Sequence, residues 1–208
     1  MPSSTLKSWV AGRTYPVARG EKVWEPLIQR PDPADPRLSF SNLVEAHVVL
    51  ALRKQYNVRM RQVRAALDFA SSQLGIERVL LDPGLRAMPG HVFLERLREL
   101  TNLGARGQGA MPEILEAYLE RIEWDPDGVP RRMFPVTRTD HLDSSPKILS
   151  IDPSVAFGRP TVRRRAITTA VIAERFRAGE GITGIADDYE LEVSEVEEAL
   201  RYELPQAA

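Results

Sequence analysis

The chain has 208 residues, 43% of them hydrophobic and 27% charged, which is the composition of an ordinary globular protein. It contains no cysteine, which excludes a disulfide framework, a thiol nucleophile and a thiolate zinc site and is typical of a reducing compartment. No apolar run reaches the roughly 18 residues of a membrane helix and no signal peptide is recognisable, so we expect a cytoplasmic protein without membrane contact.

The net charge of −1 hides an uneven distribution. Residues 1–78 carry twelve basic and seven acidic side chains, whereas residues 170–208 carry three basic and ten acidic ones. A basic front and an acidic end favour two different partners, although chance variation among solvated helix faces is the simpler alternative.

The first third of the chain is predicted to contain a short helix, a β-hairpin and two longer helices. In chain order these are residues 3–10, the strand pair 14–17 and 22–28, and the helical stretches 39–54 and 59–74. A capping box of Asn42 and Glu45 is expected near the start of the first long helix. Gly75 is expected to cap the end of the second.

The segment Ser4-Thr5-Leu6-Lys7-Ser8-Trp9-Val10-Ala11-Gly12-Arg13 resembles the recognition helix of MerR-like winged helix-turn-helix domains, with the hairpin as the wing. The resemblance covers about the first third of the chain. It implies DNA binding, with the helix in the major groove and the basic wing on the phosphates. The candidate DNA-binding residues are Thr5, Lys7, Ser8, Arg13, Arg19 and Lys22.

Two expectations accompany this resemblance. Trp9 and Trp24 are interpreted as core aromatics, because large aromatic side chains usually pack. The MerR-like fold has a helix before its recognition helix, and Met1 stands where that helix would end. We therefore expect residues 1–82 to form a truncated winged helix-turn-helix-like region with less support for its DNA-binding helix.

The middle region, 83–140, is predicted to be mixed, with β-hairpins. Short apolar runs at 79–81 and 92–94 are strand candidates, and residues 112–121 fit a helix with a proline in its first turn. The clearest signal is the turn Asp125-Pro126-Asp127-Gly128 between the runs 122–124 and 132–136. Residues 137–147 are polar and are interpreted as a linker.

The last region, 141–208, is predicted to form a trihelical domain. Helices are expected over 169–178, over 183–189 with Thr183 as cap, and over 194–202 with Ser194 as cap. The expected core consists of apolar residues at helical spacing: Val171, Ile172, Phe176, Ile182, Ile185, Ala186, Leu191, Val193, Val196, Leu200 and Tyr202. The predicted fold class is therefore α+β and mainly helical.

The motifs of this last third resemble, in their order, the small prokaryotic helix-turn-helix-like module catalogued as domain-of-unknown-function family 433. They include Ile151-Asp152-Pro153-Ser154-Val155, Phe157-Gly158-Arg159-Pro160-Thr161-Val162 and Ile167-Thr168-Thr169, followed by 175–180, 185–189 and 193–202. That family is typically found in antitoxins paired with PIN-like ribonuclease toxins, so the chain is similar to VapB-like antitoxins. The resemblance implies a type II antitoxin that neutralises its toxin, represses its own operon and forms a homodimer or a toxin–antitoxin hetero-oligomer.

The helix in the recognition position of this domain, 194–202, is acidic. Because carboxylates repel phosphates, we expect the domain to bind protein rather than DNA. The basic exception is a set of four predicted partner-binding arginines: Arg159, Arg163, Arg164 and Arg165. Arginine pairs bidentately with carboxylates, and PIN-like nucleases hold Mg²⁺ with clustered carboxylates. A turn with solvated arginines is an equally weighted alternative.

No residue pattern favours catalysis, a metal site or a cofactor. His47, His91 and His141 lack metal-ligand spacing, and the glycine-rich run 104–109 lacks the Lys-Ser or Lys-Thr of a P-loop. We therefore expect a protein that is not an enzyme. The alternatives to an antitoxin are a stand-alone MerR-like regulator without a toxin and a purely oligomerising protein.

Overall fold

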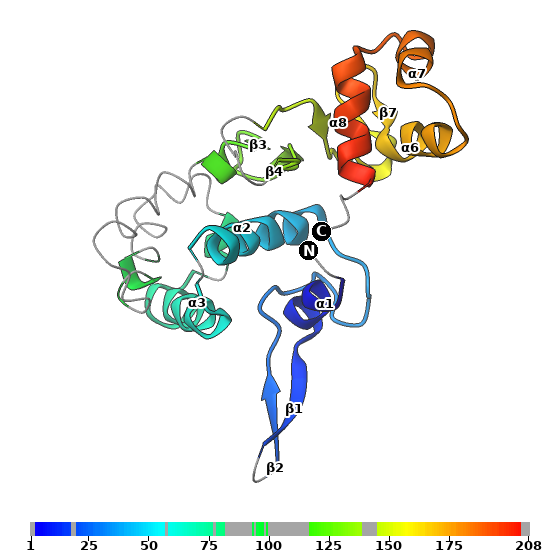
Figure 1. Ribbon diagram of the computed structural model, residues 1–208. Helices are drawn as coiled ribbons and strands as arrows, with labels where there is room; N and C mark the ends of the chain where they lie inside the picture. The colour runs from blue at the N-terminus through cyan, green and yellow to red at the C-terminus, as the bar shows by residue number, and fades with distance from the viewer. Residues whose placement is uncertain are drawn as a thin grey trace. The chain divides into compact units, whose positions relative to one another are not determined.

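The computed structural model describes residues 3–17, 20–56, 58–76, 78–81, 93, 95–97, 99, 117–138 and 145–204. The chain divides into two compact units, Met1–Glu120 (unit 1) and Arg121–Ala208 (unit 2). The described residues form an α+β fold, about half helical, with three small antiparallel sheets (Figure 1). The predicted domain boundaries after residues 82 and 140 stay a prediction. Within these residues, no helix combines the length and the apolar character that a membrane crossing requires.

Unit 1 begins with the predicted helix and hairpin. Helix α1 (Ser3–Ala11) is followed by strands β1 (Arg13–Val17) and β2 (Gly20–Trp24). The strands pair in antiparallel register, with Arg13 opposite Trp24 and Val17 opposite Gly20. The hairpin extends away from the helices of unit 1 (Figure 1), and most of its described side chains are exposed.

A tight turn and two backbone hydrogen bonds fix α1 against the base of the hairpin. Gly12 adopts φ +72°, and a Cβ at this position would lie 2.4 Å from the Trp24 carbonyl oxygen, so only glycine fits. The carbonyl of Trp9 accepts hydrogen bonds from the amides of Leu27 and Ile28 at 2.7 and 3.0 Å. These contacts hold α1 in one orientation relative to the hairpin.

Helices α2 (Phe40–Tyr56) and α3 (Met60–Leu74) supply the core of unit 1. Ser39 caps α2, because its Oγ accepts from the Asn42 amide at 3.2 Å while the Asn42 Oδ1 accepts from the Ser39 amide at 3.1 Å. The predicted box of Asn42 and Glu45 is therefore wrong by one turn. Gly75, at φ +68°, ends α3 as predicted. The buried apolar residues of the two helices are Val44, Ala46, Val48, Val49, Ala51, Leu52, Val63, Ala66 and Ala70.

The strand candidates in the rest of unit 1 are wrong wherever the structure describes them. Val79–Leu81 forms the 3₁₀ helix η1, and Phe93 is helical. Short apolar runs do not distinguish strand from helix, which explains the error. Residues 117–119 are helical within the expected helix 112–121, residues 120–121 form a turn, and residues 112–116 lie outside the described residues.

Unit 2 opens with the hairpin that the sequence predicts. Strands β3 (Ile122–Trp124) and β4 (Pro130–Met133) pair across the Asp125-Pro126-Asp127-Gly128 turn. The Asp125 carboxylate accepts from the amides of Asp127 and Val129 at 3.0 and 2.8 Å, and Gly128 adopts φ +76°. Asp and Gly thus have the roles for which such turns select them.

The rest of unit 2 is a module of one small sheet and three packed helices. Strands β5 (Leu149–Ser150), β6 (Thr161–Val162) and β7 (Ile167–Thr168) form an antiparallel sheet that the sequence did not predict. Helices α6 (Thr169–Arg177), α7 (Ile182–Asp188) and α8 (Val193–Glu203) occupy the three predicted segments. The buried core comprises Leu149, Val162, Ile172, Ala173, Ile185, Ala186, Leu191, Val196, Ala199 and Leu200.

Two details of the predicted module are wrong. The residues before α7 and α8 are Gly181 and Glu192, so Thr183 and Ser194 lie inside the helices rather than at their caps. In addition, three residues assigned to the core are exposed at 38–42%: Val171, Phe176 and Val193. These residues were expected in the core because they are hydrophobic, but only the residues along one narrow stripe of each helix face the core.

A buried arginine organises the start of unit 2. Arg121 is 3% exposed, and its guanidinium donates to four backbone carbonyls. The acceptors are Phe134 at 2.9 Å, Ser145 at 2.8 Å, Pro135 at 3.0 Å and Pro146 at 3.2 Å. One side chain therefore ties together two segments that lie on either side of residues 139–144, which are outside the described part.

A buried glutamate secures Thr137 and Arg138 to α8. Glu198 is fully buried and accepts from Thr137 and, at 2.9 Å, from Arg138. Arg201 lies 3.4 Å away on the same helix. The described part of the predicted polar linker is thus a fixed part of unit 2 rather than a free tether.

Candidate nucleic-acid and partner interfaces

The structure places three of the six predicted DNA-binding residues on α1. Lys7 is exposed, whereas Thr5 and Ser8 are half-buried. The Ser8 hydroxyl donates to the Thr5 carbonyl at 2.8 Å, so it is engaged within the helix. Lys7 is therefore the residue of α1 best placed to contact a phosphate.

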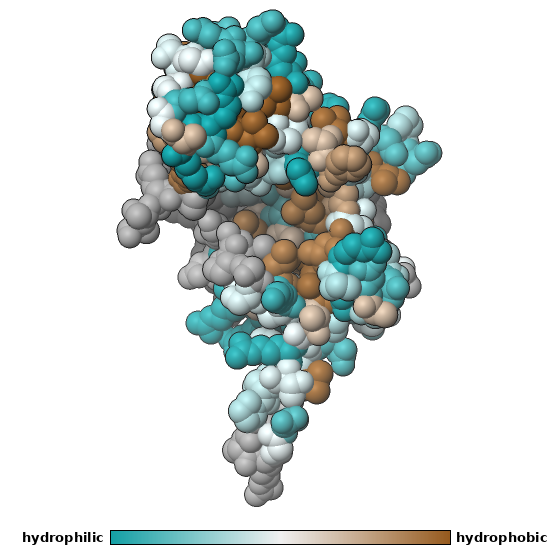
Figure 2. Space-filling view, turned by 90° about the vertical axis from the view of Figure 1, so that its right-hand side faces the viewer, coloured by the Kyte–Doolittle hydropathy of each residue, from teal (hydrophilic) through white to brown (hydrophobic). Residues whose placement is uncertain are grey.

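Two of the other three predicted DNA-binding residues, Arg13 and Lys22, belong to the hairpin. Arg13 is exposed at the first position of β1. Lys22 lies in β2 opposite Tyr15, and Arg19 lies outside the described residues. The hairpin occupies the lower end of Figure 2, where its described residues are mainly hydrophilic to neutral. Its exposed apolar exceptions are Val23 and Trp24, at 59% and 37%.

An aromatic and cationic contact holds the base of the hairpin to α3. Trp24 is 37% exposed and meets Tyr15 edge to face, with ring centroids 5.1 Å apart. The Arg64 guanidinium lies 5.5 Å from the centroid of the Trp24 ring and donates to the Glu25 carbonyl at 2.5 Å. Burial lowers the pKa of Arg64, although Asp68 and Glu25 act against this. The core assignment is therefore confirmed for Trp9, which is 3% exposed, and wrong for Trp24.

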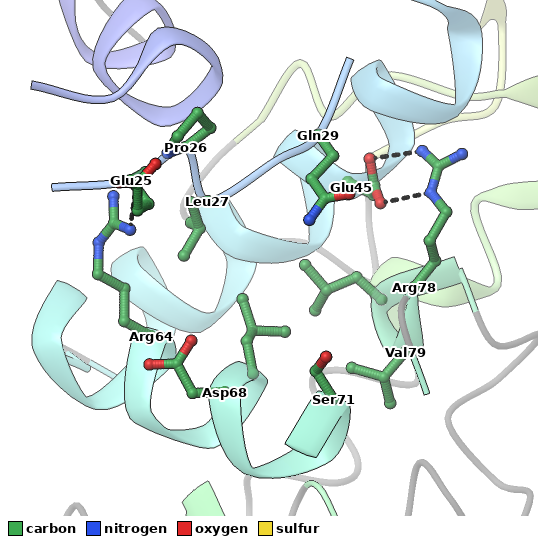
Figure 3. A pocket seen from close by; sticks show the side chains of 12 residues that line it. Glu25, Pro26, Leu27, Gln29, Glu45, Arg64, Asp68, Ser71, Arg78 and Val79 are labelled. Carbon is green, nitrogen blue, oxygen red and sulfur yellow. Dashed lines mark hydrogen bonds and ion pairs between the residues drawn. The ribbon is translucent and has the colours of Figure 1, made fainter. Parts of the chain in front are cut away.

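A pocket of about 220 Å³ lies between the segment after the hairpin, α3 and η1 (Figure 3). Glu45, 5% exposed, receives a bidentate pair of hydrogen bonds from Arg78 at 3.0 and 2.8 Å on one side of it. Arg64 enters from α3 on the other side, with Asp68 one turn further along that helix (Figure 3). The lining carries three carboxylates and two guanidinium groups, a mixture of charges that does not favour one class of ligand.

The four predicted partner-binding arginines do not form one free cluster. The Arg164 guanidinium donates to Glu195 at 3.0 and 3.1 Å and to the Glu190 carbonyl at 2.6 Å. Arg165 pairs with the Glu190 carboxylate. The β6–β7 turn is thereby bound to the α7–α8 connection, through acids 25 to 31 residues further along the chain. Sequence spacing offers no signal for such a pairing.

Arg163 and Arg159 are less engaged. The Arg163 guanidinium lies 5.5 Å from the centroid of the Phe134 ring. Arg159 is exposed, and no carboxylate of the described residues pairs with it. These two arginines remain the better candidates for contact with an acidic partner.

The loop between β5 and β6 carries a residue that the sequence analysis did not single out as a site. Phe157 is 98% exposed, and it lies within the 3₁₀ helix η4 (Ala156–Gly158). Its backbone is left-handed, with φ +57°, and so are those of Ala156 and Gly158. An unusual backbone in a short apolar run gives no pattern that sequence periodicity detects.

The described residues contain no group of three or more His, Asp or Glu side chains placed to hold a metal ion. The His47 ring is half-buried and lies 5.1 Å from that of Tyr118. His91 and His141 lie outside the described residues. Carboxylates are numerous on α7 and α8, and hydrophilic residues dominate the upper part of Figure 2, at the height of these helices.

Comparison with known proteins identifies the C-terminal module. Residues 149–202 match the model of the family described as "Protein of unknown function (DUF433)". The chain is 25% identical to "Putative antitoxin VapB45" of Mycobacterium tuberculosis, across 96% of this chain and 87% of that protein. It is 23% identical to "Uncharacterized protein Rv2308" of the same organism, across 97% and 84% respectively.

A solved structure has the same overall fold. The X-ray crystal structure of Rv2018 from Mycobacterium tuberculosis superposes with a TM-score of 0.61 at 21% identity, over 96% of this chain and 91% of that chain. The predicted family 433 module is thus confirmed for residues 149–202, and the chain is a distant relative of VapB45. The MerR-like interpretation of the front stays a prediction.

Proposed function

We propose that this chain is the antitoxin of a type II toxin–antitoxin pair: unit 2 binds and neutralises a PIN-like RNase toxin, and unit 1 binds operator DNA. The observation that carries the proposal is the similarity to VapB45 over 96% of this chain, because it includes both units rather than the C-terminal module alone. The role is binding rather than catalysis, and it needs no metal or cofactor of its own.

The division of labour follows the charges. In unit 1, α1 and the hairpin present the exposed cations Lys7 and Arg13. Cations that neutralise DNA phosphates and release their counterions supply most of the affinity of sequence-independent DNA binding. In unit 2, the stretch 149–204 carries seven arginines against eleven carboxylates, which disfavours DNA. A homodimer would place two copies of α1 on the two halves of a palindromic operator.

Co-expression tests the toxin part of the proposal. The product of the reading frame adjacent to the gene for this chain is expressed alone and together with the full chain. We expect growth arrest when it is expressed alone, rescue by the chain, and a complex that survives affinity purification. Absence of both toxicity and complex would remove the antitoxin proposal.

DNA binding is measured separately, by fluorescence anisotropy with the DNA upstream of the gene. Lys7→Ala and Arg13→Ala are each expected to reduce the slope of log affinity against log salt by about 1. Arg37→Ala is the matched control, since its side chain is 87% exposed and pairs with Asp35 in a loop of unit 1. Operator binding without any toxin partner would instead support a stand-alone MerR-like regulator.

A further inference from the structure

The loop from Asp152 to Pro160 presents an aromatic side chain entirely to solvent. Phe157 is 98% exposed, whereas the other exposed large hydrophobic residues that the structure describes retain between 37% and 59% exposure. Burying a phenylalanine side chain stabilises a protein by roughly 1.5–3 kcal/mol, and Phe157 contributes none of this to unit 2. Folding therefore gives no reason for an aromatic residue at this position.

The backbone of the loop is strained where it carries that side chain. Ala156, Phe157 and Gly158 adopt φ +48°, +57° and +76° in succession. For the two residues with a Cβ, this left-handed conformation costs roughly 1–2 kcal/mol each. Glycine or asparagine would occupy both positions at lower cost. Strain of this kind concentrates at binding sites.

A buried carboxylate holds the loop in this shape. Asp152 is 2% exposed and accepts from the Ser154 amide at 2.9 Å, the Ser154 hydroxyl at 2.5 Å and Arg132 at 2.9 Å. The amides of Val155 and Gly158 add turn hydrogen bonds of 3.0 Å each, to the carbonyls of Asp152 and Val155. Because the loop is already fixed, a partner would lose little affinity in ordering it.

The charge on and around the loop selects the kind of partner. Arg159, two residues after Phe157, is exposed and has no ion pair within the described part of the chain. The excess of carboxylates over arginines in 149–204 repels nucleic acid. Phenylalanine and arginine are each enriched in protein–protein interfaces relative to the rest of the protein surface.

We infer that Phe157 is an anchor that inserts into an apolar pocket of the protein partner, with Arg159 pairing with a carboxylate at the rim of that pocket. This inference rests on the proposed function, since the partner is the toxin that unit 2 binds. It names a contact different from the arginine turn 163–165, whose members Arg164 and Arg165 are paired within the chain.

Phe157→Gly in the full chain tests the inference, with binding to a catalytically inactive form of the toxin measured by calorimetry. We expect the affinity to fall about 30-fold or more, and about 10-fold for Arg159→Glu. Thermal unfolding should not shift downwards, because glycine suits the left-handed backbone. Val129→Ser is the matched control, since Val129 is 52% exposed on the β3–β4 turn, and its affinity should stay within threefold. Phe157→Asn, which also tolerates this backbone, repeats the measurement in case the glycine variant folds poorly.

The possible failures are distinguishable. If the unmodified chain binds the toxin and both Phe157 variants bind it equally well, the anchor is overturned and the antitoxin proposal stands. If the unmodified chain does not bind, both are overturned. A variant that instead loses operator affinity, or that changes only the mass of the homo-oligomer in light scattering, would assign Phe157 to DNA or to self-association and would equally overturn the anchor.

Discussion

Removing the guanidinium of Arg121 is expected to destabilise unit 2 selectively. The change Arg121→Met keeps a side chain of similar length and removes all four hydrogen bonds to the carbonyls of Phe134, Pro135, Ser145 and Pro146. The first three of these residues are buried, so water cannot simply replace the lost donor. The segments on either side of residues 139–144 then lose their common tie.

The expected magnitude follows from the burial of these acceptors. A buried group left without its hydrogen bond costs roughly 1–3 kcal/mol. Three such carbonyls suggest a loss of about 3–9 kcal/mol. The methionine variant no longer buries a charged group, and the desolvation cost saved in this way must be subtracted from that loss. We therefore expect unit 2 to lose about 3–5 kcal/mol. Arg121→Lys should lose nearly as much, because a point-like ammonium cannot span four carbonyls.

Hydrogen exchange measured by mass spectrometry separates the two units within the full chain. Amides in β3, β4 and the sheet β5–β7 should exchange faster in Arg121→Met, whereas those in α2 and α3 should not change. Arg131→Met, an exposed position on β4, is the control and should remain within about 0.5 kcal/mol. Protection of unit 2 unchanged in Arg121→Met would refute the argument that these hydrogen bonds hold the unit together.

Three further predictions concern other contacts. Burial raises the pKa of Glu198, but hydrogen bonds from Arg138 and Thr137 lower it by more, so its folded pKa lies below the ordinary 4.5. The stability that Glu198 contributes is complete above pH 4.5 and is lost as the pH falls through the folded pKa, so Glu198→Gln should flatten the acid side of a plot of urea midpoint against pH. Gly12→Ala should cost at least about 2 kcal/mol by urea denaturation, because its Cβ would meet the Trp24 carbonyl, whereas Gly75→Ala, with open space around it, should cost about 1 kcal/mol. Arg164→Ala should lower the stability of unit 2 by no more than about 1 kcal/mol in thermal unfolding, since the Arg164 side chain is 45% exposed. A larger loss would refute this.

Periodicity was sufficient where an element is long or its turn is distinctive. The three C-terminal helices, the hairpin around Asp125 and Gly128, and the end of α3 at Gly75 all follow from local residue patterns. By contrast, the sheet β5–β7 consists of two-residue strands, which are too short to show an alternating pattern. Its existence depends on pairing between segments that no local pattern connects.

The polar interactions could not be predicted from the sequence either, because their partners lie far apart along the chain or are backbone atoms. Arg138 and Glu198 are 60 residues apart, and the acceptors of Arg121 are backbone atoms that any residue could supply. The pairing of Arg164 and Arg165 was likewise unpredictable, because the acids that neutralise them belong to a different part of the module. The exposed side chain of Phe157 depends on a left-handed backbone that its residue type disfavours.

The pairing of Arg164 and Arg165 with their own helix acids has a consequence for how binding would respond to ionic strength. A partner that contacts these arginines must take them from Glu195 and Glu190, so one ion pair is exchanged for another and few counterions are released. Contacts made by Lys7 and Arg13 with phosphates would release counterions and weaken steeply with salt. Raising the ionic strength would therefore weaken the proposed DNA binding of unit 1 and leave protein contacts of unit 2 at the β6–β7 turn largely unchanged.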